Sequence, residues 1–407
     1  MNSANPSWIV ADSCWHSTRN LLASWPPASG PDAHLLRLEP IDWRNAMARG
    51  IRPWNWGIHG KEITPQVRLI EAELPPGWMK SYPRLGQWPL ARACRKWQKV
   101  EIPAGSKTSL WITYPYYLAL ADQLRPDGLI YYNLDDYTLY WPSKAEEVRA
   151  WEAHAVARAD WTVCVAAERA RHLRIAFPDR AERILHIPHG APEATIPIEP
   201  FLKAGPAPVE LAHIPRPWLG YLGGLEDRVD WPLVRKIAEA FPDASVVLVG
   251  PRPNLDGPEP WRVEAQAAMA KNNVYAPGSV PQERIGDVYA SFDVNLTPYD
   301  VSHAFNIVCS PTKLMDAMGC GRPMVATDLP ECRIYEGLYQ VGRDHDDFLS
   351  KLGHVIEAGF RDGQEGARWL YAREHAAPVI LDKLYRLSLC GDANSARRVL
   401  APEAPIG

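Results

Sequence analysis

The chain has 407 residues and a formal net charge of −4, and its hydrophobic and charged fractions, 46% and 23%, are those of a folded globular protein. It lacks the basic stripe typical of nucleic-acid binders and any apolar run long enough to span a bilayer. Residues 1–12 lack the basic start and apolar run of a signal peptide, so we expect a cytoplasmic protein. The length predicts two or three domains.

The seven cysteines are scattered and form no CxxC pair. Such a set is typical of reduced thiols and not of a zinc site, so we expect no metal and no cofactor. The 17 tryptophans and 39 prolines have two interpretations. They fill the core and stiffen loops, or they form a partly apolar surface for an acceptor.

Strands and helices alternate along the N-terminal half. Short apolar runs predict strands at 8–11, 34–38, 66–70, 110–113, 128–132, 161–165 and 184–187. Helical periodicity predicts helices at 144–159 and 166–177. The span 40–99, rich in Trp, Pro and Arg, gives no firm element apart from the strand at 66–70.

A proline-dense segment at 191–217 without amphipathic period predicts a linker. Beyond it we expect strands at 218–222, 244–249, 274–275, 294–297 and 324–327, with helices at 231–241, 282–290 and 313–318. Alternating strands and helices imply parallel sheets covered on both faces. We therefore predict an α/β protein of two doubly wound Rossmann-like domains that face each other across a cleft.

The most informative stretch is residues 310–327, SPTKLMDAMGCGRPMVAT. Pro311 stands where a helix would begin, with Ser310 as its N-cap and Thr312 in its first turn. The helix N-terminus and the charge of Lys313 predict a diphosphate site, and Asp316 is placed to accept hydrogen bonds from ribose hydroxyls. The alternative is a capped structural helix with Lys313 and Asp316 as a solvated pair.

This stretch resembles the C-terminal nucleotide-binding signature of GT-B-fold glycosyltransferases, in which an acidic residue precedes a run such as AMAxGxPVVAT. Four further segments agree in order: GYLGGL at 220–225, VLVGP at 247–251, NVYAPGSV at 273–280 and FDVNLTPY at 292–299. The resemblance covers most of residues 218–335. It implies a nucleotide-sugar donor held by Gly223, Gly224, Gly278, Val280 and Tyr299 together with the segment 310–316.

The resemblance also implies a domain organisation. Residues 1–200 would form an acceptor-binding domain, residues 210–374 a nucleotide-sugar-binding domain, and a C-terminal helix at about 375–407 would pack back on the first domain.

The segment LIYYNLDDY at 129–137 resembles polysaccharide-assembly glycosyltransferases, including xanthan-type glucuronosyltransferases, in which an aspartate ending this strand is taken as the general base. Asp135 matches that position, and Asp136 becomes an acceptor contact. HIPHG at 186–190 resembles the strand end before the linker in the same group and adds His189 to the acceptor contacts. A carboxylate facing the diphosphate would deprotonate the acceptor hydroxyl. The alternative is an Asx-type turn after the strand.

Three more positions are candidates by their place in the chain. Arg228 sits where many relatives place a cation near the leaving phosphates, although it could equally be a surface residue paired with Asp227 or Asp230. Asp12 and His16 follow the first strand, where a doubly wound domain receives a ligand. His16 is otherwise a structural histidine.

One feature departs from the family 4 retaining enzymes, which usually carry two acidic residues spaced E-x7-E. Asp316 fills the second place, but Val308 fills the first. His303, Asn306 and Ser310 are then left to contact the sugar, and inversion with Asp135 as base is favoured.

These observations together predict a metal-independent glycosyltransferase. It would move a sugar from a UDP-sugar to a glycan or lipid-linked glycan in bacterial surface polysaccharide assembly, with peripheral contact to the inner membrane face through the span 40–99. The alternatives are a nucleotide-sugar 2-epimerase of the same shape and an inactive nucleotide- or glycan-binding scaffold.

Overall fold

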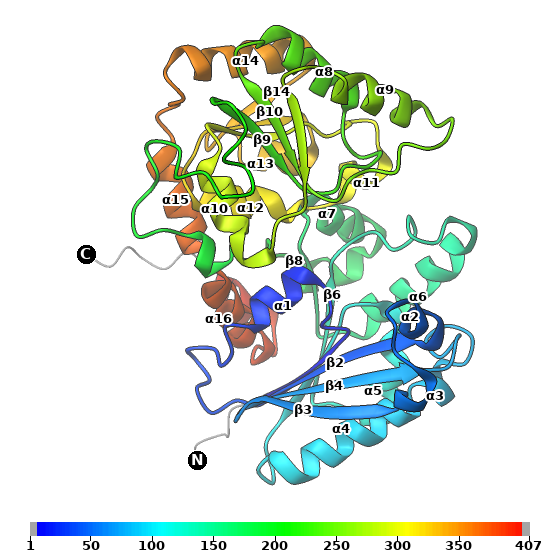
Figure 1. Ribbon diagram of the computed structural model, residues 1–407. Helices are drawn as coiled ribbons and strands as arrows, with labels where there is room; N and C mark the ends of the chain where they lie inside the picture. Colours follow the sequence, from blue (N-terminus) through cyan, green and yellow to red (C-terminus); the bar gives the residue numbers. More distant parts are fainter. Residues whose placement is uncertain (1–5, 401–407) are drawn as a thin grey trace. The chain divides into compact units, whose positions relative to one another are not determined.

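The computed structural model describes residues 6–400, which form two units, each built on its own sheet (Figure 1). The N-terminal unit contains the chain up to Pro188 and again from Ala377, and the C-terminal unit is His189–Ala376. Within the described range, no helix combines the length and the apolar character needed to cross a membrane.

The N-terminal unit has an eight-stranded sheet in the order β3-β4-β2-β1-β5-β6-β7-β8. Its strands are β1 Ser7–Ala11, β2 Leu35–Asp42, β3 Ile58–Thr64, β4 Val67–Leu74, β5 Thr108–Ile112, β6 Gly128–Asn133, β7 Trp161–Cys164 and β8 Ile184–His186. The seven strands predicted in this half are confirmed. β3, an antiparallel edge strand, was missed because all of its residues are exposed and give no apolar period.

The alternation of side chains along β1 divides the core of this unit in two. Ile9 and Ala11 face α4 Trp88–Glu101, α5 Leu118–Leu124, α6 Ala145–Arg158 and α7 Ala167–Ala176. Trp8 and Val10 face α1 His16–Leu22, α16 Ala377–Ser388 and α17 Ala393–Leu400. The sequence placed one helix at about 375–407; the structure has two, and residues 401–407 lie outside the described part.

The C-terminal unit has a six-stranded parallel sheet in the order β11-β10-β9-β12-β13-β14. Its strands are β9 Trp218–Leu222, β10 Ser245–Val249, β11 Val274–Gly278, β12 Val294–Thr297, β13 Met324–Thr327 and β14 Gln340–Gly342. Its helices are α8 Trp231–Ala240, α9 Pro260–Met269, α10 Ile285–Ser291, α11 Ala304–Val308, α12 Thr312–Gly319, α13 Pro330–Ile334, α14 His345–Glu357 and α15 Glu365–Glu374. The five strands predicted here are confirmed, and β14 was not predicted.

The segment predicted as a linker is packed on the C-terminal unit. Leu211 and Ile214 are buried in a cluster with Trp218 of β9. The backbone N–H of Phe201 donates to the carbonyl of Cys320 at 3.0 Å. The segment 191–217 has only these few apolar contacts among many prolines, so its sequence showed no periodic element.

Among the parallel strands of each sheet the strand order reverses once. The C-terminal unit builds outward from β9 to β11 on one side and from β12 to β14 on the other, so the reversal lies between β9 and β12. In the N-terminal unit it lies between β1 and β5. Ligands of doubly wound sheets bind beyond the carboxyl ends of the strands at such a point.

Candidate donor and acceptor sites

Three glycine turns meet at the carboxyl edge of the C-terminal sheet. The backbone N–H of Gly223, after β9, donates to the carbonyl of Val249 at 2.9 Å, and that of Gly250 donates to the carbonyl of Gly278 at 3.0 Å. A Cβ atom on Gly250 would lie 1.9 Å from the carbonyl oxygen of Gly223. The backbone at Gly250 therefore packs directly against the backbone at Gly223, and a side chain at Gly250 would prevent this close contact.

Lys313, in the first turn of α12, is held over the glycine turn at Gly223. Its Nζ donates to the hydroxyl of Tyr221 at 2.9 Å and to the hydroxyl of Tyr299, and lies 4.4 Å from the centroid of each ring. A Cβ on Gly223 would approach this Nζ to 2.5 Å. Burial raises the pKa of Tyr221 well above its usual value, so its hydroxyl stays neutral beside the cation. A fixed cation thus stands at the strand-order reversal.

The beginning of α12 differs from the prediction in two respects. The helix begins at Thr312, so Pro311 occupies the N-cap position and not the first helical one. Ser310 is not the cap: its hydroxyl donates to Oε1 of the buried Glu331 at 2.9 Å. Ser310 lies one residue too early to reach the N–H groups of the first turn.

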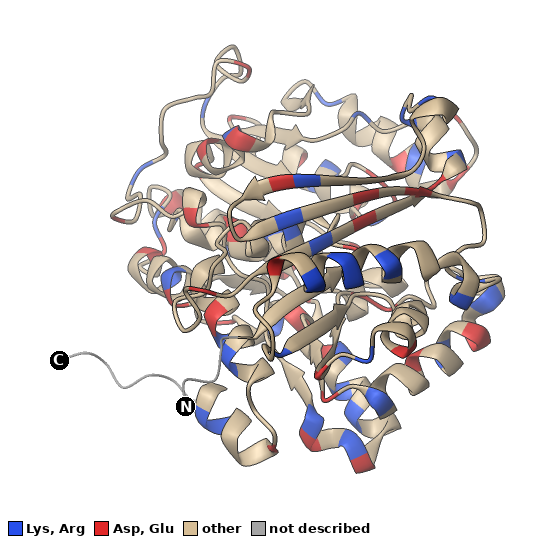
Figure 2. Ribbon diagram, turned by 90° about the horizontal axis from the view of Figure 1, so that it is seen from below, with Lys and Arg blue, Asp and Glu red and all other residues tan. Residues whose placement is uncertain are grey.

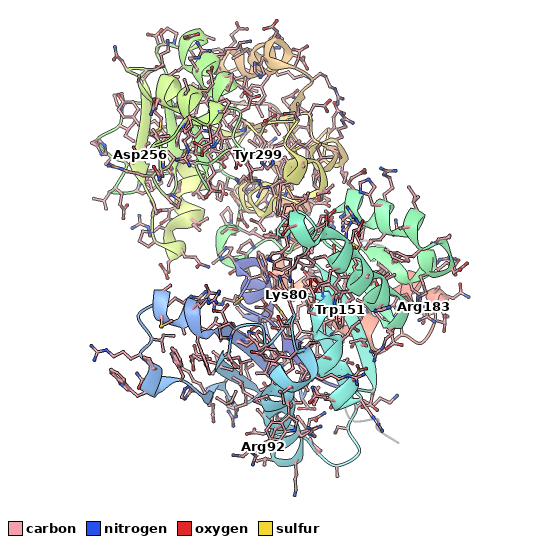
Figure 3. The ribbon with its side chains drawn as sticks, turned by 90° about the vertical axis from the view of Figure 1, so that its right-hand side faces the viewer. Lys80, Arg92, Trp151, Arg183, Asp256 and Tyr299 are labelled. Atoms are coloured by element: carbon pink, nitrogen blue, oxygen red, sulfur yellow. The ribbon has the colours of Figure 1, made fainter. Side chains whose placement is uncertain are left out.

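Arg228 is built into the same region. Its Nε donates to Oδ1 of Asn306 at 2.9 Å, and its guanidinium carbon lies 5.2 Å from the ring centroids of both Tyr299 and Phe305. Asn306 is fully buried and donates from Nδ2 to the backbone carbonyl of Arg228 at 2.9 Å. Asn306, which the sequence offered as a sugar contact, therefore orients Arg228. Tyr299 (Figure 3) joins the two cations in one cluster.

Asp316 lies one turn after Lys313 in α12 and is 8% exposed, which excludes the predicted alternative of a solvated pair. Burial raises the pKa of Asp316 to about 7, and the nearby charge of Lys313 opposes that rise. Near pH 7 the Asp316 carboxyl group is therefore present in both its protonated and its ionised form.

The remaining predicted donor contacts lie around this cluster. The carbonyl of Gly224 accepts a hydrogen bond from the Tyr221 hydroxyl at 2.9 Å. Gly278 ends β11 with φ of +103°, and a Cβ there would meet nothing within 4 Å. Val280 is half-buried against the cluster that contains Trp218. Gly278 thus ends an edge strand that lies two strands from β9, and Val280 follows it.

In the N-terminal unit, Asp135 follows β6. Its Oδ2 accepts from the hydroxyl of Tyr140 at 2.9 Å, and its Oδ1 accepts from the backbone N–H of Asp136 at 3.1 Å. Oδ1 of Asp136 accepts from the backbone N–H of Thr138 at 3.0 Å and from its hydroxyl at 2.6 Å. The turn that the sequence offered as an alternative is therefore present, and Asp136 makes it.

A buried network supports the segment that carries Asp135. Arg169 forms an ion pair with Glu152 and lies 3.4 Å from Oδ2 of Asp136. The hydroxyl of Tyr131 donates to Glu152 at 3.0 Å, and Nδ2 of Asn133 donates to the carbonyl of Asp135 at 3.1 Å. No sequence spacing pointed to Arg169, because its partners Glu152 and Asp136 come from α6 and from the segment after β6.

The other predicted acceptor contacts are only partly brought together. Asp12 follows β1 with φ of +62°, accepts from Sγ of Cys14 at 2.6 Å, and has its pKa raised to about 6 by burial. His16, exposed at the start of α1, contacts Asn20 at 3.1 Å. His189 is buried and opens the C-terminal unit, so it does not belong to the unit of Asp12 and His16.

Comparison with known proteins agrees with this architecture. Residues 216–358 match the family described as Glycosyl transferases group 1. A putative teichuronic acid biosynthesis glycosyltransferase, TuaH, of Bacillus subtilis is 23% identical over 267 residues, covering 62% of this chain and 64% of that relative. The match thus spans less than two thirds of that relative's length.

Solved structures share the fold at low identity. Sucrose-phosphate synthase of Thermosynechococcus elongatus superposes with a TM-score of 0.67 at 13% identity, covering 94% of this chain and 98% of that one. Anabaena HepE in complex with UDP and glucose gives a TM-score of 0.59 at 14% identity, covering 95% and 99%. A UDP-forming trehalose-phosphate synthase from Burkholderia vietnamiensis gives 0.63 at 11% identity, covering 95% and 99%. The chain thus shares the two-domain fold of these structures, and its residues 216–358 match a family of glycosyl transferases.

Proposed function

We propose that this protein transfers a sugar from a UDP-sugar to a glycan or lipid-linked glycan in surface polysaccharide assembly, without a metal or a resident cofactor. The observation that carries the proposal is the cluster of Lys313, Arg228 and Tyr299 at the strand-order reversal of the C-terminal unit. Two fixed cations beside tight glycine turns suit a diphosphate, whose charge grows as the sugar bond breaks. The UDP complexes of HepE support the choice of nucleotide.

Within this proposal each charged group has one role. Lys313 binds the diphosphate, and Arg228 stabilises the charge that develops on the leaving group. Asp316 accepts hydrogen bonds from the ribose hydroxyls. Asp135 takes the proton of the acceptor hydroxyl, held by Tyr140 so that one oxygen is fixed. A base acting directly on the acceptor implies inversion at the anomeric carbon.

The donor part of the proposal is tested with Lys313→Met, which keeps the apolar stem and removes the charge. We expect UDP affinity, measured by calorimetry, to fall by about 10- to 100-fold, because a charge-assisted hydrogen bond is worth about 1.5–3 kcal/mol. Lys236→Met, an exposed lysine of the same unit, is the matched control. Unchanged UDP affinity in Lys313→Met would remove the diphosphate site.

The acceptor part is tested with Asp135→Asn, which keeps the hydrogen bond from Tyr140. We expect transfer to fall by about 10²- to 10⁴-fold with UDP affinity unchanged, as for loss of a general base. Near wild-type transfer would remove Asp135 from this role. Incubation of the protein with UDP-sugar alone separates the 2-epimerase alternative, which would convert the donor without acceptor.

We place the protein in the cytoplasm, in peripheral contact with the inner face of the membrane. This location fits a nucleotide-sugar donor made in the cytosol and a lipid-linked acceptor.

A further inference from the structure

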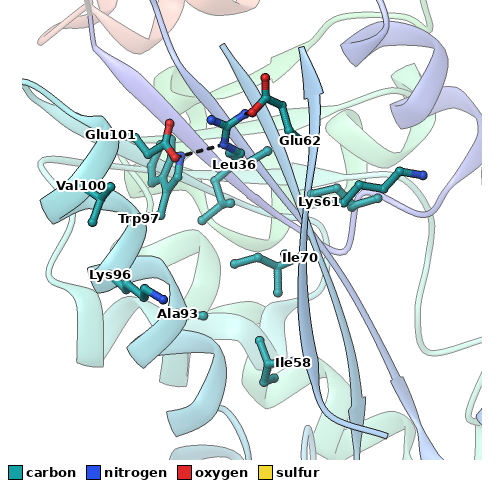
Figure 4. A pocket seen from close by; sticks show the side chains of 13 residues that line it. Leu36, Ile58, Lys61, Glu62, Ile70, Ala93, Lys96, Trp97, Val100 and Glu101 are labelled. Carbon is teal, nitrogen blue, oxygen red and sulfur yellow. Dashed lines mark hydrogen bonds and ion pairs between the residues drawn. The ribbon is translucent and has the colours of Figure 1, made fainter. Parts of the chain in front are cut away.

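A groove of about 370 Å³ opens between the β3–β4 hairpin and α4 of the N-terminal unit (Figure 4). None of the residues placed in the candidate donor or acceptor sites lines it. Leu36, Ile70 and Trp97 form its buried floor, while Ile58 and Val100 at its mouth are 39% and 71% exposed. The groove is therefore an apolar slot that remains open to solvent.

The side chains of this slot suit an apolar occupant. Leu36, Ile70 and Trp97 present hydrocarbon and ring surface, and Trp97 is 6% exposed. Its indole N–H is enclosed by the protein and takes no part in lining the slot. The floor therefore fits a hydrocarbon chain.

Charged side chains border the slot. Both acidic side chains at its rim, Glu62 and Glu101, are paired with Arg68, at 2.7 Å and 3.0 Å. Lys96, also at the rim, forms no ion pair within the described chain, whereas the side chain of Lys61 extends away from the slot (Figure 4). Two carboxylates, one guanidinium and one ammonium leave the rim without net charge, so the positive charge of this region lies on the outer face of α4.

The outer face of α4 is basic. Arg92, Arg95, Lys96 and Lys99 are exposed and have no acidic partner in the part of the chain that the structure describes. Basic positions follow one another along this helix in Figure 2, and Arg92 is labelled on it in Figure 3. In a protein of net charge −4 such a row indicates a local attraction for anions.

Exposed apolar side chains accompany the basic row. Trp88 in the first turn of α4 is 50% exposed, and Leu85 just before the helix is 74% exposed. Indole rings favour the boundary between water and lipid, and lysine stems lie along apolar surface while their charges stay in water. A basic helix flanked by apolar side chains is typical of attachment to an anionic bilayer surface.

We propose that the β3–α4 groove and the outer face of α4 bind an anionic phospholipid at the surface of a bilayer. The acyl chain lies on the apolar floor, the phosphate is held by Lys96, and the rest of the basic row of α4 meets the neighbouring headgroups. This inference rests on the membrane contact in the proposed function, but not on the sugar transferred.

The test is sedimentation of the full chain with phosphatidylglycerol–phosphatidylcholine vesicles and with phosphatidylcholine vesicles alone. We expect binding to the anionic vesicles only, weakening as salt is raised. The double variant Lys96→Gln, Lys99→Gln should bind at least about tenfold more weakly, since each basic residue near such a surface contributes about 1 kcal/mol. The matched control changes two exposed lysines of the C-terminal unit, Lys203→Gln and Lys236→Gln, and should bind as the wild type does.

The groove itself is tested without changing charge. Ile58→Ser with Val100→Ser strips two exposed apolar side chains from its mouth and should lower vesicle binding severalfold. UDP affinity should stay unchanged in every variant, so loss of lipid binding and failure of the donor site are told apart. Equal binding to both kinds of vesicle, or wild-type binding by the Lys96, Lys99 double variant, would overturn the proposal.

Discussion

We expect the buried carboxyl group of Asp316 to lower the stability of the protein when it is ionised, although the same group is proposed to bind the donor. Its pKa rises from 3.8 to about 7 on folding, so the folded state holds more protons than the unfolded state between these values. The free energy of unfolding should therefore fall as pH rises from about 4 to 7. A shift of about 3 units corresponds to about 4 kcal/mol of destabilisation once the group is ionised.

Asp316→Asn removes this cost of ionisation and keeps the shape of the side chain. A buried amide without a partner costs about 1–3 kcal/mol, so we expect a net gain of about 1–3 kcal/mol at pH 8. At pH 4 the acid is neutral in both states, and the variant should be equal to the wild type or less stable. If Asp316 binds ribose hydroxyls, the same variant should bind UDP about tenfold more weakly.

The measurement is hydrogen exchange of peptides from β12 and β13, which reports the opening free energy of the C-terminal unit alone. Asp256→Asn, at an exposed position of the same unit, is the control and should change neither stability nor its pH dependence. A wild-type opening free energy that stays flat between pH 4 and 8, or an Asp316→Asn variant less stable at pH 8, would refute this account.

Three further predictions follow from close contacts. Gly223→Ala should displace the Nζ of Lys313, which would lie 2.5 Å from the new Cβ, and lower UDP affinity about tenfold or more in calorimetry while the fold is retained. Gly250→Ala should lower the midpoint of thermal unfolding by several degrees, because its Cβ would meet backbone that cannot move aside. Arg169→Met should cost about 3–5 kcal/mol by leaving Glu152 buried without its cation, and adding Glu152→Gln should recover part of that loss in chemical denaturation; an Arg169→Met variant as stable as the wild type would contradict the role of the network.

The predictions that held were those that depend on local patterns. Short apolar runs identified twelve strands because buried parallel strands are continuously apolar. The span 40–99, rich in Trp, Pro and Arg, gave no firm helix, although it holds most of α4, whose first turn tolerates Pro89. β3 stayed hidden because an exposed edge strand has no apolar face to detect.

By itself the sequence determined the class of fold and located the segment proposed to bind the donor, since glycine turns and a helix start near Lys313 are local features. The tertiary structure alone decided what each group contacts. Lys313 meets Tyr221, 92 residues away, and Arg228 meets Asn306, 78 residues away, because strand order places β9 beside β12. Burial, which sets the pKa of Asp316, depends in the same way on all the elements packed around α12, and no local pattern encodes it.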